Sequence, residues 1–268
     1  RESERLSPMT SHTSSRRFLT KSPIVIVMAD AATRAGRFLI KDFNEIDRLK
    51  VSRKGVRDFV SNADTFAEKN LREDLAKARP DFGFLLEEGG EVKGKDPTSR
   101  WIIDPLDGTS NFLHGIPHFC ISLAYEKNDI IQAGLIYLPL TDEIFWAERG
   151  CGAFLGFTRL RVSEREEFDT TLVATIPSPH WDKAVEVFGA LRVTGSTALD
   201  LAYVAAGKFD GFFVSRLSSW DIAAGVLLVT EAGGMIESYD GKESPFHSGN
   251  IIAGSLKTFS KLVNIIRA

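Results

Sequence analysis

An apolar run that ends abruptly in two carboxylates is the feature that most constrains this chain. Trp101–Ile103 has the aromatic and β-branched composition of a buried strand, and Asp104-Pro105-Leu106-Asp107-Gly108 follows it directly. Because proline cannot donate to a β-ladder, the strand is predicted to end at Asp104. Asp104 and Asp107 are then expected together in a turn at a strand end, where clustered carboxylate oxygens suit Mg²⁺.

The residues after this turn favour an anion. Thr109 and Ser110 stand where a helix or turn can begin, with backbone N–H groups free to face a negative charge. Metal-binding acids beside such a turn indicate phosphate chemistry. The alternative is an ordinary polar turn, since Asp, Pro and Gly are the usual turn residues. An EF-hand loop does not fit because Leu106 and Gly108 occupy ligand positions, and no Gly-Lys-Ser/Thr of a P-loop occurs.

Two more acidic positions follow or precede apolar segments. The run Phe82–Leu86 ends in Glu87-Glu88 and predicts a second strand that terminates in paired carboxylates. Asp221 precedes Ile222–Gly234, a nearly wholly apolar stretch that predicts a buried helix. Asp221 is therefore either the N-cap of that helix, a metal ligand or both, because a carboxylate has two oxygens.

These segments resemble a known family. Leu86-Glu87-Glu88, the run Asp104–Thr109 and Trp220–Gly225 are similar to the three signatures of the inositol monophosphatase family, which are Mg²⁺-dependent, Li⁺-sensitive phosphomonoesterases. The resemblance extends from about Ile24 to the end of the chain and includes Gly195–Asp200. It implies a layered αβαβα sandwich, with an N-terminal α+β half and a C-terminal α/β half.

Carried over residue by residue, the resemblance implies a metal site for two or three Mg²⁺ ions. Thr109, oriented by Asp64, would pair with Glu87 to activate the attacking water. Without the resemblance, Asp64 is equally well explained as a helix cap before Thr65. The implied metal ligands are Glu87, Asp104, Asp107, Asp221 and the carbonyl of Leu106, and the implied substrate contacts are Asp107, Gly108, Thr109, Ser110, Thr197 and Asp221.

The chain departs from the family pattern where the substrate is selected. Val214 stands seven positions before Asp221, where these enzymes typically carry a Glu that grips the inositol hydroxyls. Leu86 and Gly89 replace the usual Gly and Ser beside the Glu-Glu pair, and Ser110 replaces a common Thr. Because the valine side chain cannot accept a hydrogen bond from a hydroxyl group, the sequence determines the identity of the substrate less well than it determines the metal ligands.

Three functions stay open on these residues. A phosphatase for a small sugar or polyol phosphate, with inositol-1-phosphate as the family default, comes first. A phosphatase for fructose 1,6-bisphosphate or a 3′-phosphonucleotide is the second. A catalytically weak, metal-dependent regulatory protein is the third, and retention of all the acidic ligands argues against it.

Composition limits the compartment and the partners that we expect for this chain. The 268 residues, 43% of them hydrophobic, are ample for a buried core, and the net charge of −3 gives no reason to expect a nucleic-acid partner. Two cysteines, Cys120 and Cys151, favour a reducing compartment, and no apolar run is long enough to cross a bilayer. We therefore expect a cytoplasmic protein with no membrane contact, and the resemblance implies a homodimer that acts on a small phosphorylated metabolite.

The order of elements predicts two halves behind a disordered tail at residues 1–22. An α+β half over residues 23–150 would carry the first two motifs, and an α/β half over residues 151–268 the third. A cleft between the halves would hold the site. Helices are predicted at Pro23 onwards, Asp64–Ala78, His180–Leu191, Thr197–Ala206 and after Asp221; strands at Phe84–Leu86, Trp101–Asp104, Phe119–Tyr125, Ile131–Leu138, Glu143–Glu148, Leu172–Ile176, Gly211–Val214 and Met235–Ser238.

Overall fold

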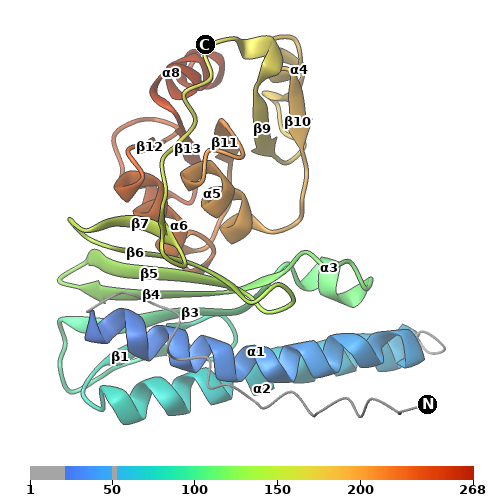
Figure 1. The fold of residues 1–268 in the computed structure, drawn as a ribbon, viewed down its shortest axis with the longest axis vertical. Helices are drawn as coiled ribbons and strands as arrows, with labels where there is room; N and C mark the ends of the chain where they lie inside the picture. Colours follow the sequence, from blue (N-terminus) through green and yellow to red (C-terminus); the bar gives the residue numbers. More distant parts are fainter. Residues whose placement is uncertain (1–21, 50–52) are drawn as a thin grey trace, which may run out of the picture.

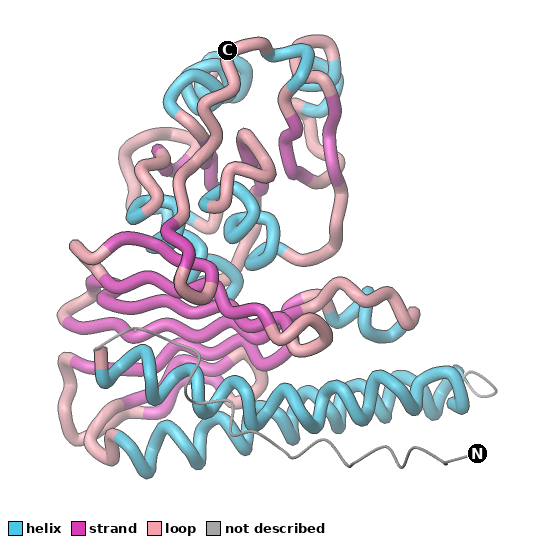
Figure 2. The backbone as a smooth tube through the Cα atoms, in the orientation of Figure 1, coloured by secondary structure: helices cyan, strands magenta, loops and turns pink. Residues whose placement is uncertain are grey.

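Helices and sheets alternate in five layers in the computed structural model, which describes residues 22–49 and 53–268 (Figure 1). Two long helices cover one face of an eight-stranded sheet, and two shorter helices separate it from a five-stranded sheet (Figures 1 and 2). The outermost helices lie beyond the second sheet. The predicted αβαβα sandwich is confirmed.

The first layer consists of α1 (Pro23–Leu49) and α2 (Arg53–Ala78). Met28, Ala32, Ala35 and Leu39 recur at helical spacing along α1, and all four are fully buried against the sheet. The helix predicted from Pro23 is confirmed. The second helix begins well before Asp64, so the reading of Asp64 as a helix cap is wrong. The tail predicted at residues 1–22 lies outside the described residues, apart from Ser22.

The large sheet has the strand order β2-β1-β3-β4-β5-β6-β7-β8. Its strands β4 to β6 form an antiparallel meander, as the turn residues between them predict. The strand β3 pairs antiparallel with β4, and β1 lies parallel to β3. The short strands β2, β7 and β8 were not predicted. The bounds are β1 Gly83–Leu86, β2 Gly90–Val92, β3 Ser99–Asp107, β4 Cys120–Lys127, β5 Ile130–Leu138, β6 Glu143–Glu148, β7 Gly152–Leu155 and β8 Thr158–Arg159.

The end of β3 differs from the prediction. The strand continues through Pro105 to Asp107, and its register with β4 shifts between Asp104 and Asp107. An irregularity of this kind leaves a residue outside the ladder, which is where a strand tolerates a proline. Both aspartates therefore project from a distorted strand end, with the turn itself starting only at Gly108.

The second sheet has the order β10-β9-β11-β13-β12. The helix predicted at His180–Leu191 is wrong: α4 covers only Trp181–Val185, and Ala190–Arg192 form β10, parallel to β9. Gly189 packs directly against the backbone of Asp169, a contact that leaves no room for a side chain. The other bounds are η2 Phe168–Thr170, β9 Leu172–Thr175, α5 Thr197–Ala205, β11 Gly211–Val214, α6 Ser219–Glu231, β12 Met235–Ser238, α7 Pro245–Ser248, β13 Ile251–Gly254 and α8 Leu256–Ile266.

Helices α5 and α6 form the middle layer, and α6 contacts the large sheet very closely. A Cβ atom built on Gly134 of β5 would lie 2.9 Å from the Cα of Ala224, and one on Gly225 would lie 2.5 Å from the Cβ of Leu201. Glycines at both contacts let the helix approach β5 on one side and α5 on the other. The N-terminus of α6, with Asp221, is thereby fixed relative to β3.

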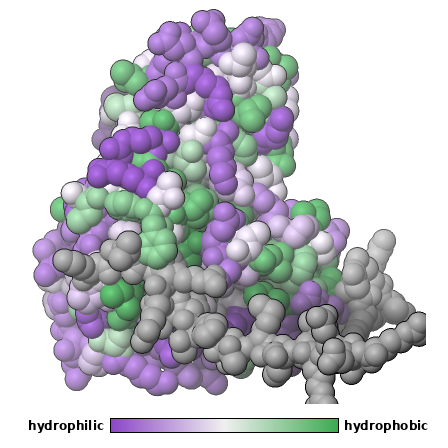
Figure 3. Space-filling view, viewed as in Figure 1, coloured by the Kyte–Doolittle hydropathy of each residue, from purple (hydrophilic) through white to green (hydrophobic). Residues whose placement is uncertain are grey.

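Two observations concern the molecule as a whole. The large sheet continues beyond residue 151, because β7 and β8 belong to it and β8 ends at Arg159. The predicted boundary of the two halves between residues 150 and 151 therefore stays a prediction. Hydrophilic residues dominate the upper end of the molecule in Figure 3. Among the described helices, none is both long and apolar enough to cross a membrane.

Candidate active site

Asp104 and Asp107 are held at the distorted end of β3 by different partners. Asp104 is only 2% exposed, and its Oδ1 accepts the backbone N–H of Leu106 at 3.0 Å. Asp107 reaches across to the middle layer, where its Oδ2 accepts the hydroxyl of Ser196 at 2.6 Å and the N–H of Ala198 at 2.7 Å. The carboxylate of Asp107 thus joins the large sheet to the start of α5.

Glu87 follows β1 beside the end of β3, and its own N–H donates to the carbonyl of Ile103 at 3.2 Å. Its Oε2 is buried without a hydrogen-bond partner among the described residues. Asp64, on α2, is 4% exposed and also has an unpartnered buried oxygen, Oδ1. Buried carboxylate oxygens without donors are costly unless a cation or a proton satisfies them.

The turn after β3, where the phosphate contacts are predicted, is built on a glycine. Gly108 has φ of +95°, and a Cβ there would lie 2.8 Å from the carbonyl oxygen of His118, so only glycine fits. Thr109 and Ser110 open the short helix α3 (Thr109–Leu113), whose first N–H groups have no partner within the helix. The hydroxyl of Thr109 donates to the carbonyl of Leu106 at 2.9 Å. Its predicted orientation by Asp64 therefore stays a prediction.

Asp221 occupies the third position of α6 and is not its N-cap. Ser218 is the N-cap, and the Oδ2 of Asp221 accepts the N–H of Ser218 at 2.7 Å in a capping box. The cap therefore uses one carboxylate oxygen of Asp221. Asp221 thus caps α6 from the N3 position. This arrangement is compatible with the expectation that one residue can be both a cap and a metal ligand.

Residues 194–200, which end in the first turn of α5, contribute groups that the predicted site did not include. Ser196 binds Asp107 directly, and Asp200 is 5% exposed and accepts the hydroxyl of Thr194 at 2.7 Å. The side-chain amide of Asn111 donates to the carbonyls of His118 and Thr194, at 2.8 and 2.9 Å. Of this segment only Thr197, the first residue of α5, was predicted to contact substrate.

A local signal for these missed residues was present but weak. The run Gly195–Asp200 resembles the family, and a Ser-Thr pair before an apolar helix is a typical N-terminal signal. Nothing in the sequence pairs Ser196 with Asp107, which is 89 residues away. That contact exists only because α5 lies on the large sheet.

Burial and mutual repulsion raise the pKa values of the carboxyls in this cluster. Burial, assisted by the charges of Glu87, Glu88 and Glu68, raises the pKa of Asp64 to about 8. Burial also raises the pKa of Glu87 to about 7, with Asp221 and Asp107 adding to the shift. The pKa of Asp107 rises to about 6 for the same first reason, although its hydrogen bonds from Ser196 and Ala198 oppose the shift.

Asp104 and Asp221 show the same tendency. Burial, together with the charges of Asp107 and Glu87, raises the pKa of Asp104 well above its ordinary value. Burial raises the pKa of Asp221, opposed by the N–H of Ser218. A cluster of carboxyls that disfavour their own ionisation is a group of oxygen donors suited to a hard divalent cation.

The donor set fits a metal ion, but the ligands are not yet gathered around one point. Glu87 and Asp64 each offer a buried oxygen without a donor, and the acids perturb one another's pKa. Within residues 22–49 and 53–268, no three or more His, Cys, Asp or Glu side chains converge closely enough to hold an ion.

Comparison with known proteins decides the family. The model of the inositol monophosphatase family matches residues 20–267. The chain belongs to this family. The resemblance seen in the three acidic motifs is thereby confirmed, and with it the assignment of the chain as a phosphoric monoester hydrolase of the inositol monophosphatase type. Members of the family are in general metal-dependent.

Relatives of the inositol monophosphatase family match over nearly the whole chain. An inositol-1-monophosphatase of Rhizobium meliloti (strain 1021) is 46% identical over 93% of this chain and 98% of its own length. A Nus factor SuhB of Escherichia coli (strain K12) is 39% identical over 91% of this chain and 96% of its own. The relatives thus carry two kinds of name.

Solved structures agree with the family assignment. The extragenic suppressor protein suhB from Bartonella henselae superposes with a TM-score of 0.85, at 45% identity, over 92% of this chain and 100% of that one. An inositol monophosphatase from Anabaena (Nostoc) sp. PCC 7120 gives a TM-score of 0.79 at 30% identity, over 91% and 95% of the two chains. The layered fold is therefore that of the family.

Proposed function

We propose that this protein is a Mg²⁺-dependent phosphomonoesterase that hydrolyses a small sugar or polyol phosphate, with inositol-1-phosphate as the first candidate. The observation that supports it best is the cluster of buried and half-buried carboxyls at the ends of β1 and β3, at the start of α6 and on α2, in which Glu87 and Asp64 each keep a buried oxygen without a donor. Such a cluster is unfavourable in the absence of a cation.

The metal would be held by oxygen donors from three elements: Glu87, Asp104, Asp107, Asp221 and the carbonyl of Leu106. Two or three ions would match this number of carboxylates. When bound, Mg²⁺ would lower the pKa of a coordinated water and screen the charge of the phosphoryl oxygens.

The residues of the chain would then supply positioning and proton transfer. Glu87, which keeps a buried oxygen without a donor, would accept the proton of the attacking water, with Thr109 and Asp64 orienting that water. The N–H groups of Thr109 and Ser110, next to Gly108, would hold the phosphate oxygens, and Thr197 would contact the substrate from α5. Phosphoryl transfer needs little else, because positioning and charge stabilisation supply most of the rate.

Val214 bears on which phosphoester is used. It is 4% exposed and belongs to the core around α5 and α6, so it offers the substrate neither a charge nor a hydrogen-bond acceptor. Arg216 follows two residues later, is exposed, and holds φ of +65°, an uncommon conformation for a residue other than glycine. A substrate with a second phosphate, such as fructose 1,6-bisphosphate or a 3′-phosphonucleotide, is therefore the alternative.

A regulatory role is the candidate of a different class. It is supported by the relatives named Nus factor SuhB, at 38–39% identity. The complete set of acidic residues argues for catalysis, since a protein that only regulates has no need of buried, unpaired carboxylates. The two roles are not exclusive.

Replacement of single ligands tests the proposed reaction. Asp107→Asn and Asp221→Asn each remove one negative charge and keep the shape, so both variants should lose hydrolysis at saturating Mg²⁺. The measurement is phosphate release from a panel of phosphorylated metabolites, with and without Mg²⁺. Asp182→Asn, an exposed residue of α4, is the matched control. Wild-type turnover by either site variant would refute the metal-site assignment.

The remaining expectations are part of the same proposal. We infer inhibition by Li⁺, which is close to Mg²⁺ in size but has half the charge, a homodimeric state and a cytoplasmic location. Activity measured at rising concentrations of LiCl tests the inhibition, and sedimentation of the purified chain tests the homodimeric state. A panel assay in which only bisphosphorylated substrates are hydrolysed would favour the alternative substrate class.

A further inference from the structure

The turn between β1 and β2, at residues 87–89, is held by a side chain of α2. Glu68 lies one helical turn after Asp64 on the buried face of that helix, and it is 6% exposed. Its Oε2 accepts the backbone N–H of Glu88 at 2.9 Å. Glu68 takes no part in the metal and phosphate contacts proposed above, so its burial needs another explanation.

Gly89 leaves room for this carboxylate beside the turn. A Cβ atom built on Gly89 would lie 2.9 Å from the Oε1 of Glu68 and 2.8 Å from the Cδ1 of Leu86. Burial raises the pKa of Glu68, and the backbone N–H groups of Glu88 and Gly89 oppose that rise. The carboxylate therefore faces two successive N–H groups, an arrangement that favours an anion. Gly89, where the family usually has Ser, thus has a local structural role.

Glu87, the first residue of the turn, is fixed on both sides. Its own N–H donates to the carbonyl of Ile103 on β3 at 3.2 Å, and the next N–H along the chain, that of Glu88, donates to Glu68. Two consecutive peptide groups are thus tied to two different elements, β3 and α2. Because the rotamers open to a side chain depend on its backbone, these bonds limit the directions in which the carboxylate of Glu87 can point.

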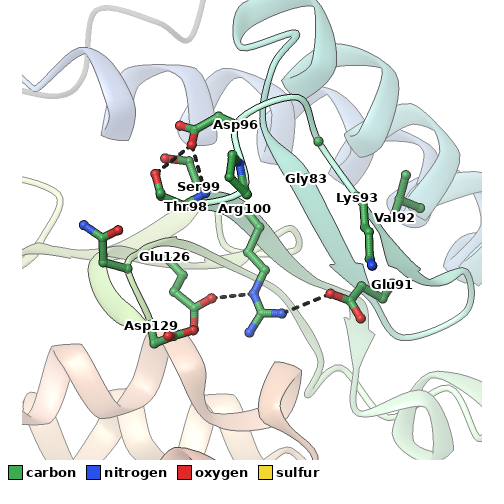
Figure 4. A pocket seen from close by; sticks show the side chains of 13 residues that line it. Gly83, Glu91, Val92, Lys93, Asp96, Thr98, Ser99, Arg100, Glu126 and Asp129 are labelled. Carbon is green, nitrogen blue, oxygen red and sulfur yellow. Dashed lines mark hydrogen bonds and ion pairs between the residues drawn. The ribbon is translucent and has the colours of Figure 1, made fainter.

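Glu91 offers a comparison, because it belongs to the same hairpin but binds elsewhere. It lies on β2 and pairs with Arg100 at 3.7 Å, beside the pocket that Figure 4 shows. That pocket is lined by Gly83, the first residue of β1, whereas Glu87 follows the last. The side chain of Glu91 is largely exposed. Its replacement removes a charge near the hairpin and leaves the contact between Glu68 and Glu88 in place.

From these contacts we infer that Glu68 is a positioning residue for the proposed hydrolysis, because it fixes the place of Glu87 through the N–H groups of the turn. This role rests on the proposed function, in which Glu87 holds the metal and accepts a proton. Partners that orient a metal ligand are typically worth about 10- to 100-fold in metal affinity or activity. The effect of Glu68 passes along the backbone of the turn.

Glu68→Gln and Glu68→Met separate the hydrogen bond from the charge. Both variants lose the same negative charge and keep a similar side-chain volume, but only Gln keeps an oxygen that can accept the N–H of Glu88. The first readout is amide hydrogen exchange of the metal-free protein, which reports local opening. The amide of Glu88 should exchange about tenfold or more faster in Glu68→Met than in the wild type, and at least about threefold more slowly in Glu68→Gln than in Glu68→Met.

The second readout is the affinity of the metal site, measured by calorimetric titration of the full chain with MgCl₂. Glu68→Met should bind Mg²⁺ about tenfold or more weakly, and Glu68→Gln should recover most of the affinity. On a panel of phosphoesters, Glu68→Met should lose kcat with little change in KM, because the phosphate contacts at residues 108–110 are untouched. Glu91→Met, the same substitution on β2, should match the wild type in all three measurements.

Gly89→Ala tests the contact from the turn and guards against misfolding of Glu68→Met. Gly89 is exposed and does not hold a positive φ, so its backbone suits alanine. The new Cβ would displace the carboxylate of Glu68. Exchange at Glu88 should therefore become faster, and Mg²⁺ binding weaker, each about two- to fivefold.

Equal effects of Glu68→Gln and Glu68→Met would overturn the inference, because the charge and not the acceptor would then matter. Wild-type Mg²⁺ affinity in Glu68→Met, or unchanged exchange at Glu88 in Gly89→Ala, would overturn it as well. If the expected pattern of exchange and Mg²⁺ affinity holds while the wild type hydrolyses no phosphoester, the proposed function is wrong and the positioning of Glu87 by Glu68 stands.

Discussion

At the level of single residues, Asp107 shows how one side chain serves two purposes. Its Oδ2 is held by Ser196 and Ala198 from α5, while its position at the end of β3 brings it to Asp104. The sequence identified Asp107 as a site residue because of Pro105 and Gly108 beside it. The two donors could not be predicted, since they come from a segment about 90 residues away, as the separations of 89 and 91 positions show.

Asp200 allows a test of how a buried acid affects the free energy of unfolding. Burial raises its pKa to about 7, against about 3.9 in an unfolded chain. The native state therefore holds more protons than the unfolded state in this interval, and the free energy of unfolding falls as the pH rises from about 4 to about 7. Asp200→Asn cannot ionise and can still accept the hydroxyl of Thr194.

We predict that Asp200→Asn melts at a higher temperature than the wild type at pH 8, and that this difference shrinks towards pH 4. Melting curves of both proteins, recorded without Mg²⁺ across that interval, provide the measurement. A difference that is constant with pH would mean that Asp200 does not carry the shift.

Val214 gives a prediction about substrate choice. Val214→Glu should lower the KM for inositol-1-phosphate, because a charge-assisted hydrogen bond to a hydroxyl is worth about 1.5–3 kcal/mol, or roughly ten- to a hundredfold in kcat/KM. The new charge enters a buried position, so the variant should also melt earlier than the wild type.

Two controls accompany Val214→Glu. A small generic phosphoester should be hydrolysed equally by both proteins, because the metal site is untouched. Val214→Gln, uncharged and of similar shape, should show a smaller gain. If the wild type already uses inositol-1-phosphate efficiently and Val214→Glu changes nothing, residue 214 does not select the substrate.

At the level of elements, periodicity predicted most of what was found and failed where tertiary contacts decide. The meander β4 to β6 and the helices α1, α5 and α6 follow from apolar spacing and turn residues. The strand β3 runs on through Pro105 because a register shift accommodates the proline. The helix predicted over residues 180–191 gives way to β10, since Gly189 and the pairing with β9 outweigh local propensity.

The contact between α6 and β5 links packing to the site. A Cβ on Gly134 meets the Cα and carbonyl oxygen of Ala224 at 2.9 Å, and neither backbone atom can move by itself. Gly134→Ala should therefore displace α6 as a unit, at a cost of about 1–3 kcal/mol in stability. Because Asp221 is carried by α6, the concentration of Mg²⁺ needed for half-maximal activity should rise.

Thermal melting and a Mg²⁺ titration of activity check both parts of this prediction. Gln132→Ala, on the same strand and outside the glycine contact, serves as the control. A loss of stability with an unchanged Mg²⁺ requirement would show that α6 does not position Asp221.

At the level of the whole molecule, the acidic cluster links stability to pH and metal. Burial raises the pKa of Asp64 to about 8 and that of Glu87 to about 7, so metal-free protein should lose stability as the pH rises from about 4 to about 8. Mg²⁺ binds the ionised carboxylates in competition with protons. It should therefore raise the melting temperature more at pH 8 than at pH 5.

Differential scanning calorimetry with EDTA or with Mg²⁺, at the two pH values, measures this linkage. The exposed Asp182→Asn variant should follow the wild type, whereas Asp107→Asn should lose most of the gain from Mg²⁺. An equal gain at pH 5 and pH 8 would contradict the assignment of these carboxyls as the ligands.

The hydrogen bonds of Asp107 also bear on how the protein is made. The helices α1 and α2 and the meander come from one continuous stretch and can assemble while the chain is still leaving the ribosome. Ser196 and Ala198 are translated about 90 residues after Asp107, and Asp221 later still. A nascent chain that already contains the complete large sheet thus still carries carboxylates without their partners. Catalytic competence can arise only when synthesis is nearly finished.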